Sequence, residues 1–141
     1  MSAALKQRAR IARVRRLQHN MAASSAAAAA GQLRSLEVNR ERLAQMRGEL
    51  NPAEGTTSGA WLSAASELAT RLDMARLGLS GSIDAARKVA AAREQARVHA
   101  RKTQEGAEKL EAAAARAAAE ASENRMNKGA PRRRGKGAAD T

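Results

Sequence analysis

Few residues in this chain are of the types that carry out catalysis or bind metal ions. There is no cysteine, and the two histidines, His19 and His99, are far apart with no suitably spaced acidic partner beside either. A protein metal site usually needs three or four ligands, so we expect no metal and no cofactor. Several glutamates lie among Lys and Arg at a spacing typical of solvated helical ion pairs rather than catalytic acids: Glu105, Glu108, Glu111, Glu120 and Glu123. With no nucleophile–base pair and no phosphate-binding loop, we expect that the protein is not an enzyme.

Positive charge is the main chemistry that the chain offers, and it gathers at the two ends. The formal net charge is +12, of which residues 1–20 contribute +6, residues 125–141 contribute +5 and residues 21–124 only +1. Such a distribution favours binding to an acidic partner. The first segment contains no acidic residue, and its arginines are the candidate contacts: Arg8, Arg10, Arg13, Arg15 and Arg16.

Two other partners are compatible with basic ends. The sequence pI near 11.5 and the "RRRGKG" stretch suit nucleic acid, although the chain has no aromatic platform for bases and an almost neutral middle. Residues 5–17 could instead form an amphipathic helix at a membrane surface, with Ile11, Val14 and Leu17 facing lipid. No stretch approaches 18 consecutive apolar residues, and "MSAALKQRARIARVRRL" lacks the apolar run of a secretory signal.

The composition predicts that long helices must position these residues. Alanine is abundant and is the best helix former, whereas proline occurs only twice, so an all-α protein is expected. The breaker segment "ELNPAEGTTS" predicts a first helix over about 3–48, a loop over 49–58 and a second helix over about 59–125. Helices joined by a short loop favour an antiparallel hairpin. We therefore predict a two-helix coiled-coil hairpin over 1–128 with both basic ends at its open end, followed by a disordered basic tail over 129–141.

A repeat of alternating three- and four-residue steps predicts which residues face the partner helix. Starting at Trp61, these steps reach 18 positions up to Ala121, and 15 of them are apolar. Because alanine inflates this count, the informative members are the larger side chains: Trp61, Leu68, Leu72, Leu79, Val89 and Leu110. The first helix has two stripes that join only with a stutter: Ile11, Val14, Leu17 and Met21, then Leu36, Leu43, Met46 and Leu50. Small alanines along this seam are expected to let the two backbones approach closely.

Trp61 is the only aromatic residue of the chain, and it follows a Gly-Thr-Thr-Ser turn. We expect Trp61 mainly to fill the splayed end of the hairpin, and to share in a partner interface as a bulky anchor. In the same helix "GLSGS" at 78–82 is expected to be a soft spot, or alternatively a hinge, because each glycine within a helix costs about 1 kcal/mol relative to alanine.

The stretch "GTTSGAW", with Gly55, Thr57, Ser58 and Trp61 between a shorter and a longer helix, resembles the FliJ family of the flagellar type III export apparatus. "ENRMNK" at 123–128 is also similar to what such chains carry before a basic C-terminal region. The resemblance covers nearly the whole chain in architecture but only about a dozen residues in letters. It implies a cytoplasmic protein, peripheral at the inner membrane, that acts as a coiled-coil stalk in the export ATPase ring. It also implies contacts with the export gate and with export chaperones.

The resemblance suggests two sets of contact residues in this chain. Arg8, Arg10, Arg13, Arg15 and Arg16 would face the ATPase ring. Trp61, Leu68, Leu72, Ala75 and Leu79 would face the gate or chaperones, although this helix lacks the further bulky residues that the family usually carries there. The alternatives are a basic coiled-coil nucleic-acid-binding protein and a coiled-coil adaptor of another kind. The sequence does not distinguish a flagellar from a virulence-type export system.

Overall fold

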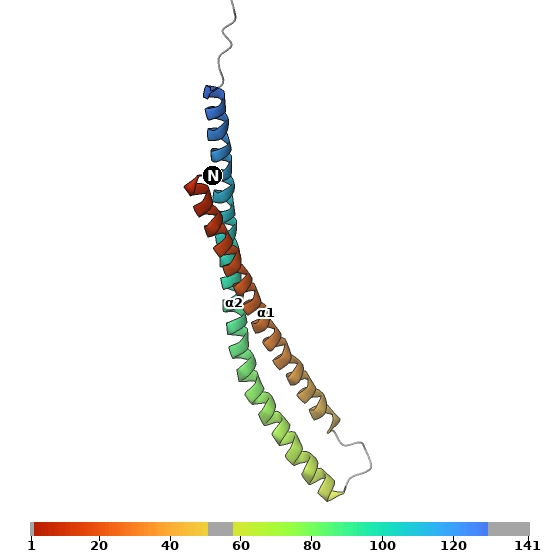
Figure 1. Cartoon of the computed structure of the whole chain (residues 1–141). Helices are drawn as coiled ribbons and strands as arrows, with labels where there is room; N and C mark the ends of the chain where they lie inside the picture. Colours follow the sequence, from red (N-terminus) through yellow and green to blue (C-terminus); the bar gives the residue numbers. More distant parts are fainter. Residues whose placement is uncertain (1, 51–57, 130–141) are drawn as a thin grey trace, which may run out of the picture. The chain divides into compact units, whose positions relative to one another are not determined.

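The computed structural model describes residues 2–50 and 58–129, and within these ranges it contains helices and no strand. Helix α1 spans Ala3–Glu49 and helix α2 spans Gly59–Gly129 (Figure 1). The predicted all-α class with two long, mutually contacting helices is confirmed. Helix α1 ends one residue later than predicted, and α2 continues four residues beyond residue 125. Most of the predicted loop, residues 51–57, and the predicted tail from residue 130 onward lie outside the described residues.

Each helix begins at a serine that caps its first turn. The Ser2 Oγ accepts a hydrogen bond from the Leu5 N–H at 3.2 Å, and the Ser58 Oγ accepts one from the Trp61 N–H at the same distance. A serine in this position satisfies a backbone donor that has no partner within the helix, which stabilises the helix by about 1 kcal/mol. Ser58 therefore marks where α2 starts and places Trp61 in its first turn.

The two helices form two compact units, and each unit contains a stretch of both helices. Unit 1 comprises the described residues 2–18 and 101–129, and unit 2 comprises 19–50 and 58–100. Ion pairs in unit 2 join Glu37 to Arg87 and Arg47 to Asp73, so the α2 number falls as the α1 number rises. The two stretches of unit 2 therefore run antiparallel, as predicted.

The buried residues of α2 correct half of the predicted seam. Every seventh position from Ala65 to Ala114, including Leu72, Leu79 and Ala107, was predicted to lie in the seam, and all of these residues except Arg93 are buried or half-buried. The other seam positions, which alternate with these along the helix, lie one residue later than predicted. Ile83 is therefore fully buried while Ser82, the predicted seam residue, is exposed. Four of the large residues assigned to the seam are exposed instead: Trp61, Leu68, Val89 and Leu110.

The seam of α1 also differs from the prediction, because it has no stutter. Residues spaced by seven are buried or half-buried without interruption: Leu5, Ala12, His19, Ala26, Leu33, Arg40 and Arg47. Of the stripe predicted from Ile11, Val14, Leu17 and Met21, Ile11 is half-buried, whereas the other three residues are 52%, 60% and 65% exposed. The second predicted stripe is half-buried at Leu36, Leu43 and Leu50 and exposed at Met46. Alanine, histidine and arginine at the true seam positions conceal the heptad from a search for large apolar side chains.

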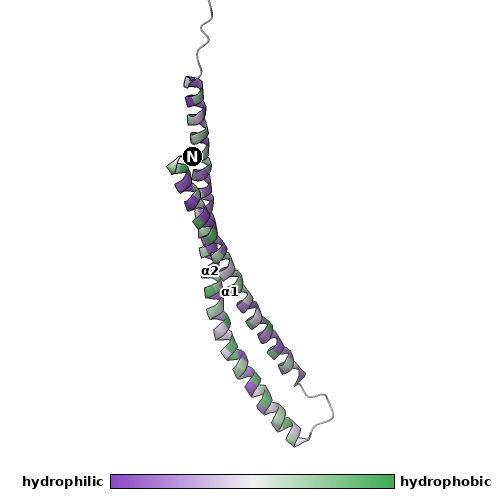
Figure 2. Cartoon of the chain, viewed as in Figure 1, coloured by the Kyte–Doolittle hydropathy of each residue, from purple (hydrophilic) through white to green (hydrophobic). Residues whose placement is uncertain are grey.

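The core of both units is thin. Only five described residues are buried: Ala12, Ala26, Leu72, Ile83 and Ala107. Figure 2 shows polar and apolar residues interleaved along both helices rather than gathered into a broad apolar band. Most of the larger apolar side chains therefore remain available for contacts outside the hairpin.

Candidate partner-binding surfaces

The arginines near the start of α1 are exposed, as their sequence context suggested. Arg8, Arg10 and Arg13 form no ion pair or hydrogen bond with any described residue. The Arg15 guanidinium donates to the side-chain oxygen of Gln18 at 3.0 Å. Because no acidic side chain among the described residues neutralises Arg8, Arg10 and Arg13, their charge is available to a partner.

Arg16 has a different role, because it joins the two helices of unit 1. Its Nε donates to the Glu108 carboxylate at 3.0 Å, and a terminal nitrogen lies 4.0 Å from the Glu111 carboxylate. Gln104 donates a second hydrogen bond to Glu108 at 3.1 Å. The hydrogen bonds from Gln104, and then from Arg16, hold the pKa of the Glu108 carboxyl below its ordinary value. Of the five predicted arginines, Arg16 is thus the one that forms ion pairs with described residues.

A groove in unit 1 runs beside Arg8 and Arg15, neither of which forms an ion pair with a described residue. Its volume is about 250 Å3, and both helices contribute to its lining: Arg8, Ile11, Arg15, Thr103, Gly106, Ala107 and Leu110. Gly106 has no neighbouring atom within 4 Å of the position that a Cβ would occupy, so its missing side chain leaves open space. No local sequence pattern predicts this groove, because the groove depends on which part of α2 lies beside Arg8 and Arg15.

The residues predicted to face the gate or chaperones divide into exposed and buried members. Trp61 and Leu68 are each 43% exposed and line a hollow of about 180 Å3 together with Leu50. Ala75 is exposed, Leu79 is half-buried, and Leu72 is buried at 6% exposure. Leu72 therefore belongs to the core, whereas Trp61 and Leu68 can contact both the hairpin and a partner.

Two exposed residues of α2 were not predicted as contacts. Met74 is 69% exposed and Leu77 is 77% exposed, the largest values for leucine and methionine in unit 2. On an α-helix they lie roughly opposite Leu72 and Ile83, since successive residues turn by about 100°. Their exposure could have been predicted from the sequence, because neither residue belongs to a stripe of large apolar residues spaced by seven.

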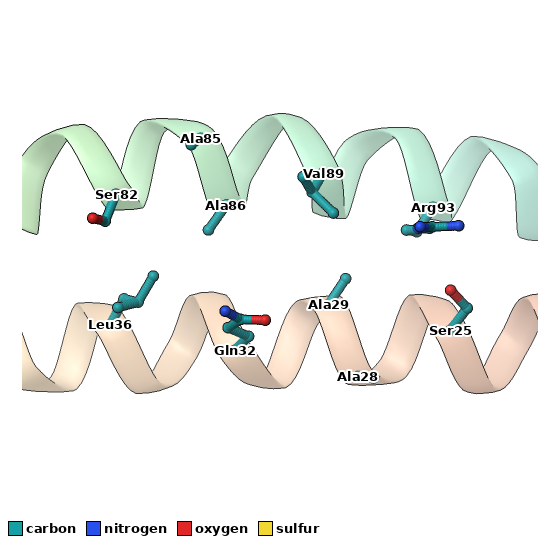
Figure 3. A pocket seen from close by; sticks show the side chains of 10 residues that line it. All are labelled: Ser25, Ala28, Ala29, Gln32, Leu36, Ser82, Ala85, Ala86, Val89 and Arg93. Carbon is teal, nitrogen blue, oxygen red and sulfur yellow. The ribbon is translucent and has the colours of Figure 1, made fainter.

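A larger groove in unit 2 is lined mainly by small side chains. It has a volume of about 580 Å3, and both helices contribute to its lining: Ser25, Ala28, Ala29, Gln32, Leu36, Ser82, Ala85, Ala86, Val89 and Arg93. Figure 3 shows Leu36 and Ala29 of one helix, and Ala86 and Val89 of the other, directed into the space between them. The alanines that we expected to draw the two backbones together line an open groove here. Short side chains do not reach across it, so this part of unit 2 gains little apolar packing.

Neither a metal centre nor a membrane span is present among residues 2–50 and 58–129. No cluster of three His, Asp or Glu side chains there could hold a metal ion. No helical stretch in the same ranges combines the length and apolar character needed to cross a bilayer.

No family model, curated protein or solved structure matches this chain. The function therefore has to be argued from the exposed arginines, the exposed apolar residues and the grooves described above.

Proposed function

We propose that this protein is a non-enzymatic coiled-coil stalk of a bacterial flagellar type III export apparatus. In this role it engages the export ATPase ring and links the ring to the export gate and to export chaperones. The resemblance of "GTTSGAW" to the FliJ family motivates the proposal. Its main structural support is the group Arg8, Arg10 and Arg13, which is exposed and unpaired on one helix of a two-helix hairpin.

The charge of this segment suits a ring whose inner surface is acidic or polar. Complementary charge accelerates encounter and orients the partners, even where it adds little affinity. In the proposed complex the protein is cytoplasmic and reaches the inner membrane only through its partners. Trp61 and Leu68 are the better candidates for the gate or chaperone contact, since Leu72 is buried within the hairpin.

The first test adds the purified chain to the export ATPase of the same organism and measures ring formation and ATP turnover. We expect stimulation at a low ratio of chain to ring. Replacing Arg8, Arg10 and Arg13 together by Gln should abolish it, because these charges have no partner within the described chain.

A matched variant separates this effect from a general loss of positive charge. Arg34, Arg42 and Arg76 are also exposed and form no ion pair with described residues, and all three belong to unit 2. Their replacement by Gln should leave the stimulation intact. Absence of stimulation by the unmodified chain, or equal losses in the two triple variants, would count against the stalk function.

Nucleic-acid binding is the second candidate, and the same unpaired arginines favour it. Phosphate contacts release counterions, so binding should weaken steeply with salt, and each lost arginine contact should reduce the slope by about one. Tight binding to a DNA duplex with this behaviour, together with no effect on the ATPase, would support this candidate over the stalk.

A further inference from the structure

We infer that the groove of unit 1 is a docking site for an acidic amphipathic helix of a partner protein. The groove is the one lined by Arg8, Ile11 and Arg15 on α1 and by Gly106 and Leu110 on α2. That the partner belongs to the export apparatus rests on the proposed stalk function. The groove itself determines the chemistry by which the partner is recognised.

The arginines of the groove set the charge of its occupant. Arg8 and Arg15 are seven residues apart, which places them on one side of α1 about 10.5 Å apart along the helix axis. Two carboxylates seven residues apart on another helix have the same spacing. A helix with acidic side chains at these positions therefore complements both arginines at once.

The floor of the groove sets the second requirement. Ile11 is half-buried and Leu110 is 50% exposed, so both offer apolar surface between the two arginines. Gly106 lines the same groove and leaves room for an incoming side chain, because no atom other than those of its chain neighbours and its own helix backbone lies within 4 Å of its Cβ position. An apolar residue between the two carboxylates of the partner helix would cover Ile11 and Leu110 and remove both surfaces from water.

The chain does not carry this helix in its own C-terminal segment. Residues 130–141 contain four basic residues and one aspartate, so they share the sign of the groove instead of complementing it. A second copy carries the same net charge of +12, which opposes association of two chains. Nucleic acid would satisfy the arginines but would leave the aliphatic floor without an apolar partner, since the chain offers no aromatic side chain there for base stacking.

The test measures binding of a synthetic helical peptide to the full-length chain by isothermal titration calorimetry. The peptide is alanine-based, about 21 residues long so that it forms a helix, and carries two glutamates seven residues apart with a leucine midway between them. We expect saturable binding that requires both glutamates and the leucine. Control peptides replace the glutamates by glutamine, or the leucine by serine.

Two variants of the chain test the two halves of the site. Arg8→Glu combined with Arg15→Glu should weaken binding at least about tenfold and should favour a peptide with lysines in place of the glutamates. Gly106→Leu should weaken binding about tenfold by occupying the groove, while helix propensity favours leucine over glycine at this position. Matched controls are Arg34→Glu with Arg42→Glu, and Gly31→Leu, which change unit 2 in the same way and should bind the peptide normally.

The outcomes separate this inference from the proposed function. No saturable binding, binding indifferent to the leucine, or binding unaffected by Gly106→Leu overturns the inference, even if the chain stimulates the export ATPase. The inference is also overturned if the peptide binds equally well without its leucine and a single-stranded oligonucleotide displaces it completely. A phosphate-binding patch would then explain the data. Peptide binding with the expected variant pattern supports the inference, even if the ATPase fails to respond and the stalk function is rejected.

Discussion

Units 1 and 2 contain the same two helices but differ in what holds the helices together. Unit 2 buries Leu72 and Ile83 together with Ala26. In unit 1 the only buried residues of the described chain are Ala12 and Ala107, which offer little apolar area. Association in unit 1 therefore depends more on polar links such as that between Arg16 and Glu108, whereas unit 2 combines the packing of Leu72 and Ile83 with two cross-helix ion pairs of its own.

The same units also differ in charge. The described residues of unit 1 carry twelve Lys and Arg against five Glu, a net charge of +7, whereas those of unit 2 carry ten against seven acids, a net charge of +3. The unit with less apolar packing thus has more self-repulsion, which lowers its stability. An acidic partner would relieve this repulsion, so the weaker unit is also the one that would gain more from binding.

The largest expected effect comes from truncating the packed residue of unit 2. Ile83→Ala should lower the free energy of unfolding by about 2–4 kcal/mol, because Ile83 is fully buried and its loss leaves a cavity. Urea unfolding followed by circular dichroism at 222 nm measures the change. Leu77→Ala, at a residue 77% exposed, is the matched control and should change stability by less than about 0.5 kcal/mol. Similar losses in both variants would mean that packing at Ile83 does not dominate unit 2.

A smaller and opposite effect is expected when the helical glycines are replaced. Gly81→Ala in unit 2 and Gly106→Ala in unit 1 should each stabilise the chain by about 0.5–1 kcal/mol, since alanine is the better helix former and no atom obstructs either Cβ. Thermal unfolding measures both. A loss of stability from Gly81→Ala would support the hinge interpretation of "GLSGS" over the soft-spot interpretation.

The smallest effect is a pH-dependent one in unit 1. The pKa of Glu108 is lowered in the folded chain, so its contribution to stability is complete above its ordinary value of 4.5 and is lost as the pH falls through the lowered value. Glu108→Gln should therefore be less stable than the unmodified chain near neutral pH, and the difference should shrink in acid. Thermal midpoints measured from pH 3 to pH 7 test this expectation.

Glu120 supplies the control for the pH measurement. It is exposed and forms no ion pair or hydrogen bond with a described residue, so Glu120→Gln should give a small difference that changes little with pH. If the two variants show the same pH profile, the links from Gln104 and Arg16 to Glu108 do not contribute measurably to unit 1.

The helices were predictable because their signals are local. Alanine content, the absence of proline between the breaker segment and residue 131, and the Ser58 cap together determine where α2 forms. The register was not predictable, because alanine fits either side of a seam and gives no preference between Ser82 and Ile83. Ile83, the only isoleucine of α2, lies four residues after Leu79 and was the one local indication of the correct register.

The candidate site was predictable only in part. Residues 1–20 contain no acid, so a partner for Arg8, Arg10 or Arg13 could come only from elsewhere in the chain, and no described residue supplies one. The pairing of Arg16 with Glu108 and the groove at Gly106 depend on cross-helix neighbours about 90 positions away in the sequence. Local sequence patterns contain no information about such neighbours until the register of the two helices is known.

Trp61 gives the protein an intrinsic spectroscopic probe at one defined place. With no Phe or Tyr in the chain, all its ultraviolet fluorescence comes from this indole, in the first turn of α2 and beside the same hollow as Leu50. At 43% exposure the indole is open to both solvent and a partner, so its emission wavelength responds to either. The intrinsic signal therefore reports directly on this part of unit 2, and following the groove of unit 1 optically requires a label placed there.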